Sequence, residues 1–341
     1  MPVADPTLTA GQYSIGTEGS SAAFVYGGSV SPWANNIQVS STSVDTGTVN
    51  VQDQAVVGQD GLQFGVDTYP GMVVTQQGQA YSPAAVAAAM DSYSALAGAW
   101  NNPAVRLADG AVQVLRAYYR GSSVVRRTYG RGRKIMPSYG MVNQGLVPWT
   151  AQFQSADNTW YEDVKSSLTL TAVPSFRGTL APPWTPPLQL AATSNYQQNT
   201  IVNSGSLPTW PVIQFNGPVS YPGITYVNTP VSIGYQGILA AGQSLTIDTR
   251  PWARTALLNS GASVAGLLTG SAMLSMQVQP GATVVHYGGQ DFTGQSYCVI
   301  TWRSATLSIG GSGTDTSGPF VIYGGSSAPG VMSGVISGGG S

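Results

Sequence analysis

The sequence predicts a mainly β protein built from two β domains, the first of which carries one α-helix. Apolar residues recur at every second position in many short segments separated by Gly, Asn, Asp and Pro, a pattern typical of half-buried antiparallel strands. One alanine-rich stretch instead follows the helical period. A proline-rich stretch divides the chain, whose 341 residues are enough for about two domains.

Residues 1–173 are expected to form the N-terminal domain. Early strand-like segments include AAFVYGG, NIQVSSTSV, TVNVQDQAVV and LQFGVDTY. Further along, AVQVLRAYYRG and SSVVRRTYGRGRKIMPS predict a hairpin that turns at RGSS. The next segment, GLVPWTAQFQSADNTWYED, predicts a strand ending in an Asp-Asn turn. The alternating segment Ser166–Val173 is expected to close this domain.

The stretch 83–100 is predicted to be the helix. Ser82 is a natural N-cap, Pro83 suits the first helical position, and the alanines favour a helix throughout. Pro103 disfavours helical backbone at the residue before it, so the helix should end at the NNP segment. The buried face is expected to hold Val86, Met90, Tyr93, Leu96 and Ala97.

The second half of the chain begins with residues 174–190, PSFRGTLAPPWTPPLQL, whose prolines predict an extended linker. Residues 191–309 contain many short strand-like segments with turn residues between them at regular spacing, which predicts an antiparallel sandwich or jelly roll. Residues 310–341 form a tail rich in Gly and Ser.

The chain is unusually poor in charge. Charged residues make up 8% of it, against about 25% in an ordinary globular protein. The formal net charge of −1 gives no overall attraction to nucleic acid or to an anionic membrane. Weakly charged surfaces associate readily, so we expect much of the surface to be covered by other chains. The sequence shows neither a signal peptide nor a long apolar run, so it predicts no membrane partner and synthesis in a cytoplasm.

The sequence offers little for catalysis, and we expect no catalytic, cofactor-binding or metal-binding residues. The single histidine, His286, lies between valines and a tyrosine and is interpreted as structural, since no nearby His or Cys completes a zinc site. The single cysteine, Cys298, has no partner for a disulfide and is interpreted as a buried thiol. One histidine suffices for a Ser-His-Asp triad, so a hydrolase stays open as the weakest alternative.

Five of the 13 basic residues fall in one segment, RRTYGRGRK. Basic residues interleaved with tyrosine can bind single-stranded nucleic acid, but the rest of the chain lacks a supporting basic surface. Arginine also suits planar, bidentate pairing at protein interfaces. We interpret the segment as a subunit contact or as pairing within the domain, and leave nucleic-acid contact and a solvated hairpin open. The candidate interface residues are Arg126, Arg127, Tyr129, Arg131, Arg133 and Lys134.

The order of several turn and strand motifs is similar to that of a known family. The motifs are NSG at Asn203–Gly205, PVIQFNG at Pro211–Gly217, GQSLTIDT at Gly242–Thr249, MQVQPG at Met276–Gly281 and WRSA at Trp302–Ala305. In this order they resemble the C-terminal module of phage distal tail proteins, especially those of long-tailed phages that infect actinobacteria. VVRRTYGRGRKIMP followed by FQSADNTWYED extends the resemblance into the N-terminal half.

This resemblance implies a tail-tube-like β-barrel or sandwich in the N-terminal domain and a galectin-like sandwich in the C-terminal domain. The N-terminal domains would form a ring, usually a hexamer, at the end of the tail tube, where the basic segment would dock a neighbouring subunit or the tube. The partners would be further copies of the chain, the tail tube protein, and the hub and receptor-binding proteins of the tail tip. Phage DNA would pass through the lumen without specific binding, and the protein would reside in the virion.

A carbohydrate-binding adhesin or receptor-binding tail module is the alternative function. Sandwiches of the galectin-like kind bind sugars through an exposed tryptophan with polar groups nearby. For each candidate, packing in the core or against the linker is the favoured interpretation. The candidates are Trp210, Trp252 and Trp302.

Overall fold

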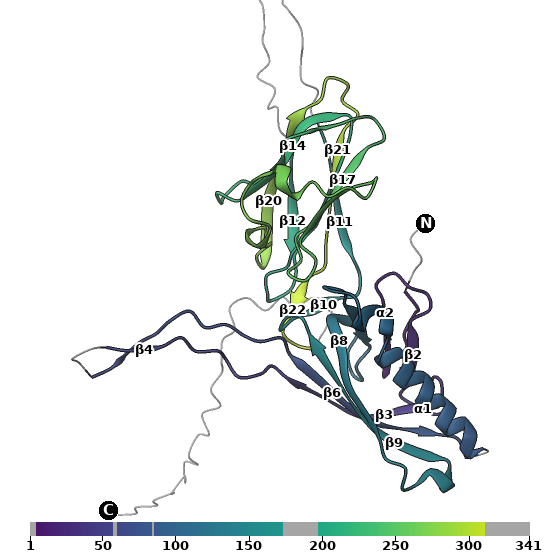
Figure 1. Ribbon diagram of the computed structural model, residues 1–341. Helices are drawn as coiled ribbons and strands as arrows, with labels where there is room; N and C mark the ends of the chain where they lie inside the picture. The colour runs from purple at the N-terminus through teal and green to yellow at the C-terminus, as the bar shows by residue number, and fades with distance from the viewer. Residues whose placement is uncertain (1–4, 57–59, 84, 173–196, 311–341) are drawn as a thin grey trace, which may run out of the picture.

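A computed structural model describes residues 5–56, 60–83, 85–172 and 197–310. The predicted linker 174–190 and the tail beyond residue 310 lie outside these ranges. The described residues form antiparallel sheets and one long helix, so the predicted mainly β class is confirmed. Figure 1 shows a sandwich above a curved sheet that carries the helix. Within the described ranges the sheets are open and do not close into a barrel.

The N-terminal domain is built on one antiparallel sheet with the strand order β2-β1-β7-β8-β9-β6-β3. The predicted hairpin is confirmed, because β7 pairs with the first half of β8. The strands are β1 (Gln12–Gly16), β2 (Phe24–Gly27), β3 (Ile37–Asp45), β6 (Val73–Tyr81), β7 (Gln113–Ala117), β8 (Arg126–Pro137) and β9 (Leu146–Ser155).

The main helix, α1 (Val86–Trp100), packs on this sheet and starts later than the sequence predicts. Ser82 is not its N-cap, because the backbone N–H of Ser82 donates to the carbonyl of Gly145 and holds this residue in a loop. The predicted end at the NNP segment is correct, and a short helix, α2 (Pro103–Arg106), follows. Val86 and Met90 are exposed, contrary to the expected face. The buried face holds Ala89, Tyr93, Leu96 and Trp100.

A long excursion between β3 and β6, described at residues 46–56 and 60–71, projects away from both domains (Figure 1). We call it the arm. Its predicted strands shrink to two residues each, β4 (Gln54–Ala55) and β5 (Leu62–Gln63), which pair only with each other among the described residues. The alternating pattern of the sequence is therefore present, but its apolar side chains have no core to enter within the described chain.

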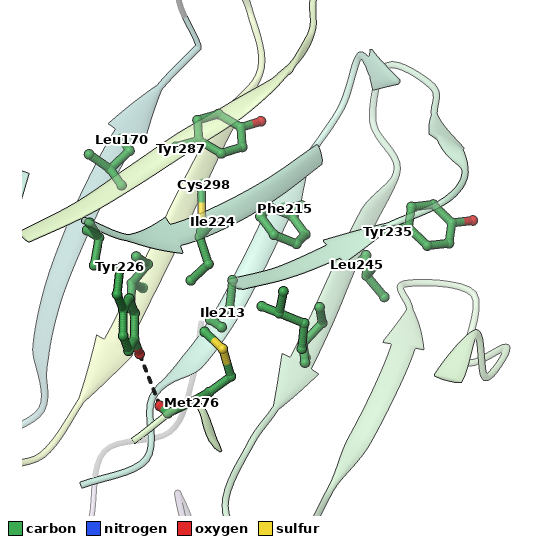
Figure 2. Close-up of a cluster of buried hydrophobic side chains, with 14 of the residues drawn as sticks. Leu170, Ile213, Phe215, Ile224, Tyr226, Tyr235, Leu245, Met276, Tyr287 and Cys298 are labelled. Carbon is green, nitrogen blue, oxygen red and sulfur yellow. Dashed lines mark hydrogen bonds between the residues drawn. The ribbon is translucent and has the colours of Figure 1, made fainter. Parts of the chain in front are cut away.

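The C-terminal domain is a sandwich of two antiparallel sheets, β11-β21-β13-β17-β18 and β12-β20-β14-β15-β19, with β16 beside β14. Figure 2 shows the apolar core between the sheets, where the Tyr226 hydroxyl donates to the Met276 carbonyl over 3.0 Å. Cys298 is buried in this core, as expected. The first sheet comprises β11 (Ser166–Thr171), β13 (Val212–Asn216), β17 (Ser244–Asp248), β18 (Thr255–Leu258) and β21 (Tyr297–Trp302). The second comprises β12 (Gln197–Asn203), β14 (Val219–Tyr226), β15 (Ser232–Tyr235), β16 (Ile238–Leu239), β19 (Leu268–Gly270) and β20 (Gly281–Gln290).

The two domains exchange strands at their junction. β11 does not close the N-terminal domain as expected, because it pairs with β21 over its whole length and buries Leu170 in the sandwich core. In return β22 (Ala305–Thr306) pairs with β10 (Trp160–Glu162) of the N-terminal sheet. The chain therefore crosses the junction in both directions. The described ranges also contain three short 3-10 helices, at Val142–Gln144, Ala265–Leu267 and Met273–Ser275.

Candidate functional site at the junction of the two domains

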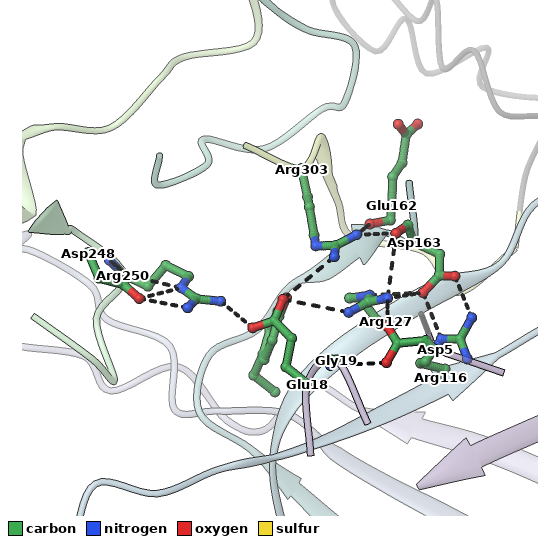
Figure 3. Close-up of polar contacts among 11 residues, drawn as sticks. Asp5, Glu18, Gly19, Arg116, Arg127, Glu162, Asp163, Asp248, Arg250 and Arg303 are labelled. Atoms are coloured by element: carbon green, nitrogen blue, oxygen red, sulfur yellow. Dashed lines mark hydrogen bonds and ion pairs between the residues drawn. The ribbon is translucent and has the colours of Figure 1, made fainter. Parts of the chain in front are cut away.

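One carboxylate joins the two domains at their junction. Glu18 lies in the turn between β1 and β2, and its carboxylate oxygens are 2.8 Å from Arg250 Nη1, 3.5 Å from Arg303 Nη2 and 3.7 Å from Arg127 Nη1 (Figure 3). Arg127 belongs to the N-terminal sheet, whereas Arg250 and Arg303 follow strands of the sandwich. Burial alone would raise the pKa of Glu18, but the three guanidinium groups outweigh it and hold the pKa at about 2.

A second carboxylate organises the N-terminal side of the junction. Arg116 binds Asp163 with two parallel hydrogen bonds of 2.8 and 2.6 Å. Arg127 binds the same carboxylate over 2.5 Å and reaches Asp5 over 2.7 Å. Paired arginines of this kind lower the pKa of Asp163, although burial acts in the opposite direction. The bidentate geometry fixes the orientation of both guanidinium planes.

On the sandwich side, Arg250 is held by Asp248 and by two aromatic rings. Its guanidinium binds the Asp248 carboxylate over 2.6 Å and lies 5.4 Å from the centre of the Tyr129 ring and 5.7 Å from that of Trp252. The Tyr129 and Trp252 rings stack at 4.7 Å, and they come from different domains. Asp248 also accepts a hydrogen bond from the backbone N–H of Arg250, so it shapes the turn after β17 as well as forming the ion pair.

These side chains form what we call the junction cluster: Asp5, Glu18, Arg116, Arg127, Asp163, Asp248, Arg250 and Arg303. It contains four acids and four bases, so its formal charges cancel. Removing charged groups from water is costly, and they are tolerated only when well paired. Although the chain has few charged residues, eight of them therefore gather at the junction, where their ion pairs link the two domains.

The basic segment that the sequence singles out is divided between two environments. Arg126, Arg127 and Tyr129 are buried within the chain. Arg127 belongs to the junction cluster, and Arg126 Nη1 lies 3.5 Å from Glu162. These three residues are thus buried and paired within the chain, and a docking role for the segment stays a prediction.

The other basic residues of the segment lie further along β8. Arg131 is half-buried and donates to the carbonyls of Ala108 and Ala111 over 2.6 and 2.7 Å. Arg133 and Lys134 are exposed, so a partner can reach them. A docking role for these residues stays a prediction.

The three candidate tryptophans all lie near the junction. Trp302 is buried and donates its indole N–H to the Val202 carbonyl over 2.9 Å, whereas Trp252 stacks on Tyr129, so both pack within the chain. Trp210 is half-buried. Trp210 and Trp302 line a cavity of about 250 Å³ between the domains, together with Glu18, Lys165 and Arg250.

His286 is half-buried on β20. Among the described residues, no three His, Cys, Asp or Glu side chains gather as metal ligands do. No helix there is long and apolar enough to cross a membrane. The acidic segment DNTWYED contributes Asp157, whose pKa burial raises to about 7 and whose carboxylate accepts from the Tyr161 hydroxyl over 2.5 Å.

Sequence reasoning missed most of the junction cluster. Glu18 and Arg303 stand alone in the sequence, and no local pattern marks them as partners. The available indication was the overall scarcity of charge, since in such a chain an isolated charged residue inside a β-rich segment calls for a buried partner. The exposure of the arm was missed as well, because alternation indicates a strand without indicating what covers it.

Comparison with known proteins gives matches in structure but not in sequence. No known protein family matches the chain, and no curated protein does. The SPP1 Dit (gp 19.1) protein, described as a paradigm of hub adsorption apparatus in Gram-positive infecting phages, aligns with a TM-score of 0.51 and 10% identity, covering 86% of this chain and 98% of that one.

Two structures of the phage P2 baseplate in its activated conformation are also similar. The one with Ca aligns with a TM-score of 0.49 and 10% identity, covering 85% of this chain and 97% of that one. The one with Sr aligns with a TM-score of 0.49 and 9% identity over the same shares. Structural neighbours of this chain are thus phage hub and baseplate proteins. At such low identity, the likeness to the SPP1 protein shows a common fold that includes both domains.

Proposed function

We propose that this chain is a distal tail protein of a phage, a structural subunit that forms a ring at the end of the tail tube. The observation that carries the proposal is the match to the SPP1 Dit protein, which extends over nearly all of that protein and includes both domains here. The junction cluster agrees with a structural role, because it fixes the sandwich on the N-terminal domain instead of presenting reactive groups. In this role the protein resides in the virion.

The arm supports assembly into a ring. It exposes a series of apolar side chains, of which Phe64 is 81% exposed. A two-stranded hairpin with exposed apolar residues is not stable on its own in water, and such a patch usually marks an interaction site. In a cyclic ring each subunit offers two different surfaces, one to each neighbour. We assign the arm to one of these surfaces. Its exposed apolar residues are Val51, Val56, Leu62, Phe64, Val66 and Tyr69.

The partners follow from the position of such a ring. The N-terminal domains contact one another and the tail tube protein, with Arg133 and Lys134 as the reachable part of the basic segment. The sandwiches face the hub and receptor-binding proteins of the tail tip. Phage DNA passes through the lumen, and a hexamer is the expected form. No step of this role requires catalysis, so we propose a non-enzymatic protein.

Assembly of the purified chain tests the proposal. Mass photometry and negative-stain imaging should find rings, and Val66→Asp on the arm should reduce their number by placing a charge in a subunit contact. Val30→Asp is the matched control, because both valines are 76% exposed and only Val66 lies on the arm. A chain that stays monomeric at high concentration, or a Val66→Asp variant that assembles like its control, contradicts ring formation through the arm.

A carbohydrate-binding role is the second candidate. The cavity at the junction supports it, because Trp210 and Trp302 meet hydroxyl and charged groups there. Aromatic faces beside hydrogen-bonding groups suit sugar rings. A glycan array with the full chain, repeated with Trp210→Ala, tests this alternative, which requires binding that the variant loses.

A further inference from the structure

The cavity between the two domains combines charged groups, aromatic rings and threonine hydroxyls in its wall. Its volume is about 250 Å³. Pockets for drug-sized molecules hold roughly 300–1,000 Å³, so this cavity suits a single small ring compound. The kind of compound that it favours depends on which groups of the wall the chain leaves unpaired.

Both carboxylates of the cavity wall are already paired. Glu18 accepts from the Tyr129 hydroxyl over 3.0 Å and from the Arg250 guanidinium over 2.8 Å (Figure 3). The two oxygens of Asp248 accept from the Arg250 guanidinium over 2.9 and 2.6 Å. Neither acid therefore needs a further cation or hydrogen-bond donor from a ligand.

One cation of the cavity wall is left over. Lys165 lies between β10 and β11, where the chain crosses from the N-terminal domain to the sandwich, and it is exposed. Within the described residues it forms no ion pair, whereas the charges of the junction cluster cancel. The wall holds three bases, Lys165, Arg250 and Arg303, and two acids, Glu18 and Asp248, so its formal charge is +1.

The wall also holds hydrogen-bonding groups that the chain does not use. The indole N–H of Trp210 is buried, and none of the described residues accepts from it, which is costly unless a ligand or water does. The Trp302 indole N–H instead donates to the Val202 carbonyl over 2.9 Å, so only its ring is available to a ligand. The hydroxyls of Thr209 and Thr301 donate to backbone carbonyls and keep their oxygens as acceptors.

We propose that this cavity binds one residue of an acidic sugar, a uronic acid, with its carboxylate toward Lys165 and its ring against Trp210 and Trp302. The carboxylate neutralises the unpaired ammonium group through a charge-assisted hydrogen bond. An oxygen of the sugar accepts from the Trp210 indole N–H, and ring hydroxyls donate to the oxygens of Thr209 and Thr301. The carbon-bound hydrogens of the sugar gain dispersion contacts with the aromatic rings.

The charge separates this ligand from other compounds of similar size. A neutral sugar leaves Lys165 without a counter-charge, and a small acid without a ring leaves the aromatic wall uncovered. The assignment rests on the carbohydrate alternative proposed above and names its ligand class. It does not depend on ring formation.

The two lysines of the chain locate the ligand in the full-length protein. Lys134 and Lys165 are both exposed, so reductive methylation with isotope-labelled formaldehyde marks them for NMR, together with the N-terminal amine, and keeps their charge. Galacturonate should shift the Lys165 signal and leave the Lys134 signal in place, whereas galactose at the same concentration should shift neither. We expect saturation with a Kd on the order of 1 mM, and weaker binding as the salt concentration rises.

Matched variants test which groups hold the ligand. Lys165→Met keeps a long side chain without its charge, and saturation-transfer NMR on galacturonate should show binding weakened by about tenfold or more. Lys134→Met is the control and should bind like the unchanged chain. Trp210→Phe keeps a ring and removes the buried N–H, so it should also weaken binding. Circular dichroism shows whether each variant is folded.

The outcomes separate this assignment from the functions proposed above. If galactose shifts the Lys165 signal as much as galacturonate does, the cavity takes neutral sugars, and only the acidic ligand class is overturned. Equal shifts with acetate overturn it as well, because the carboxylate would then bind without the ring. If galacturonate shifts neither lysine signal, or both equally, the cavity is not a site for acidic sugars. A chain that forms no rings contradicts the distal tail role and leaves this result unchanged.

Discussion

Glu18 and Arg250 are 232 positions apart in the sequence, yet the Glu18 carboxylate accepts a 2.8 Å hydrogen bond from the Arg250 guanidinium. The bond connects a turn of the N-terminal sheet to the end of a sandwich strand. Arg250 is also bound by Asp248 and packed on Tyr129, so its guanidinium is held from three sides. The contact thus acts between two rigid groups, which is the condition under which an ion pair stabilises an orientation.

Replacing Glu18 should loosen the junction. Glu18→Gln removes the charge that Arg127, Arg250 and Arg303 share, and we expect the free energy of unfolding to fall by about 1–3 kcal/mol. Small-angle X-ray scattering should show a wider distribution of domain orientations, while each domain keeps its secondary structure. Asp91→Asn, on the exposed side of α1, is the control and should change neither quantity. Equal stability of the two variants would show that the cluster does not fix the junction.

The low pKa of Glu18 also implies that the stability contributed by the junction is lost at acid pH. A carboxyl whose pKa is lower in the folded chain stabilises the fold above its unfolded pKa, and this contribution is lost as the pH falls through the folded value. For Glu18 the loss runs from about pH 4.5 down to about pH 2, and Asp163, whose pKa is also lowered, acts in the same direction. Urea unfolding at a series of pH values should show this decline. The Glu18→Gln variant should show less of it, and an identical decline would assign it to other groups.

The features that the sequence predicted correctly are those set by residues close by in the sequence. The end of α1 was correct because Pro103 acts on the residues beside it, whereas the start was wrong because Ser82 is bound by the distant Gly145. Alternation correctly indicated a strand at residues 166–171 but could not say that β21, and not the N-terminal sheet, would be its partner. Local patterns thus identify elements, and pairing decides where they belong.

The candidate site was less predictable for the same reason. The density of arginines marked the basic segment, but only tertiary contacts with Asp163 and Glu162 reveal that Arg127 and Arg126 are buried. In their local sequence, acidic residues of the junction such as Glu18 and Asp163 look like surface residues. The scarcity of charge was used only to predict that other chains cover the surface, and that expectation stays a prediction.

Asp157 gives a pH dependence of opposite sign. Burial raises its pKa from 3.8 to about 7, so the folded chain binds this proton more tightly than the unfolded chain does. The resulting stability is fully present below about pH 3.8 and is lost as the pH rises through about 7. Asp157→Asn keeps an oxygen for the Tyr161 hydroxyl and cannot ionise. We expect it to raise the free energy of unfolding by about 1 kcal/mol or more at neutral to alkaline pH.

Unfolding by urea on both sides of neutrality checks this prediction. The difference between Asp157→Asn and the unchanged chain should grow as the pH rises from about 4 to about 8. Asp109→Asn, on an exposed loop, is the control and should show no such trend. A variant that loses stability equally at every pH would mean that the carboxylate serves as an acceptor and not as a buried acid.

Stacking across the junction should contribute to domain orientation as well. Trp252→Ala removes the ring that stacks on Tyr129 at 4.7 Å, and we expect a loss of about 2 kcal/mol in the free energy of unfolding. Trp33→Ala is a matched control, because Trp33 is also half-buried and contacts one tyrosine ring, Tyr81, within a single domain. Scattering profiles should change for Trp252→Ala alone. A comparable change in both variants would assign the effect to general destabilisation.

Variants at the exposed end of the basic segment should affect assembly without affecting folding. Arg133 and Lys134 lie on the free edge of β8, so replacing both with Ala should leave the free energy of unfolding within about 0.5 kcal/mol of the unchanged chain. In the proposed ring we assign them to contacts with a neighbouring subunit or the tail tube. We therefore expect mass photometry to show fewer rings for the double variant. Arg106→Ala, also exposed but on α2, should assemble normally. Normal assembly of the double variant would contradict a docking role for Arg133 and Lys134.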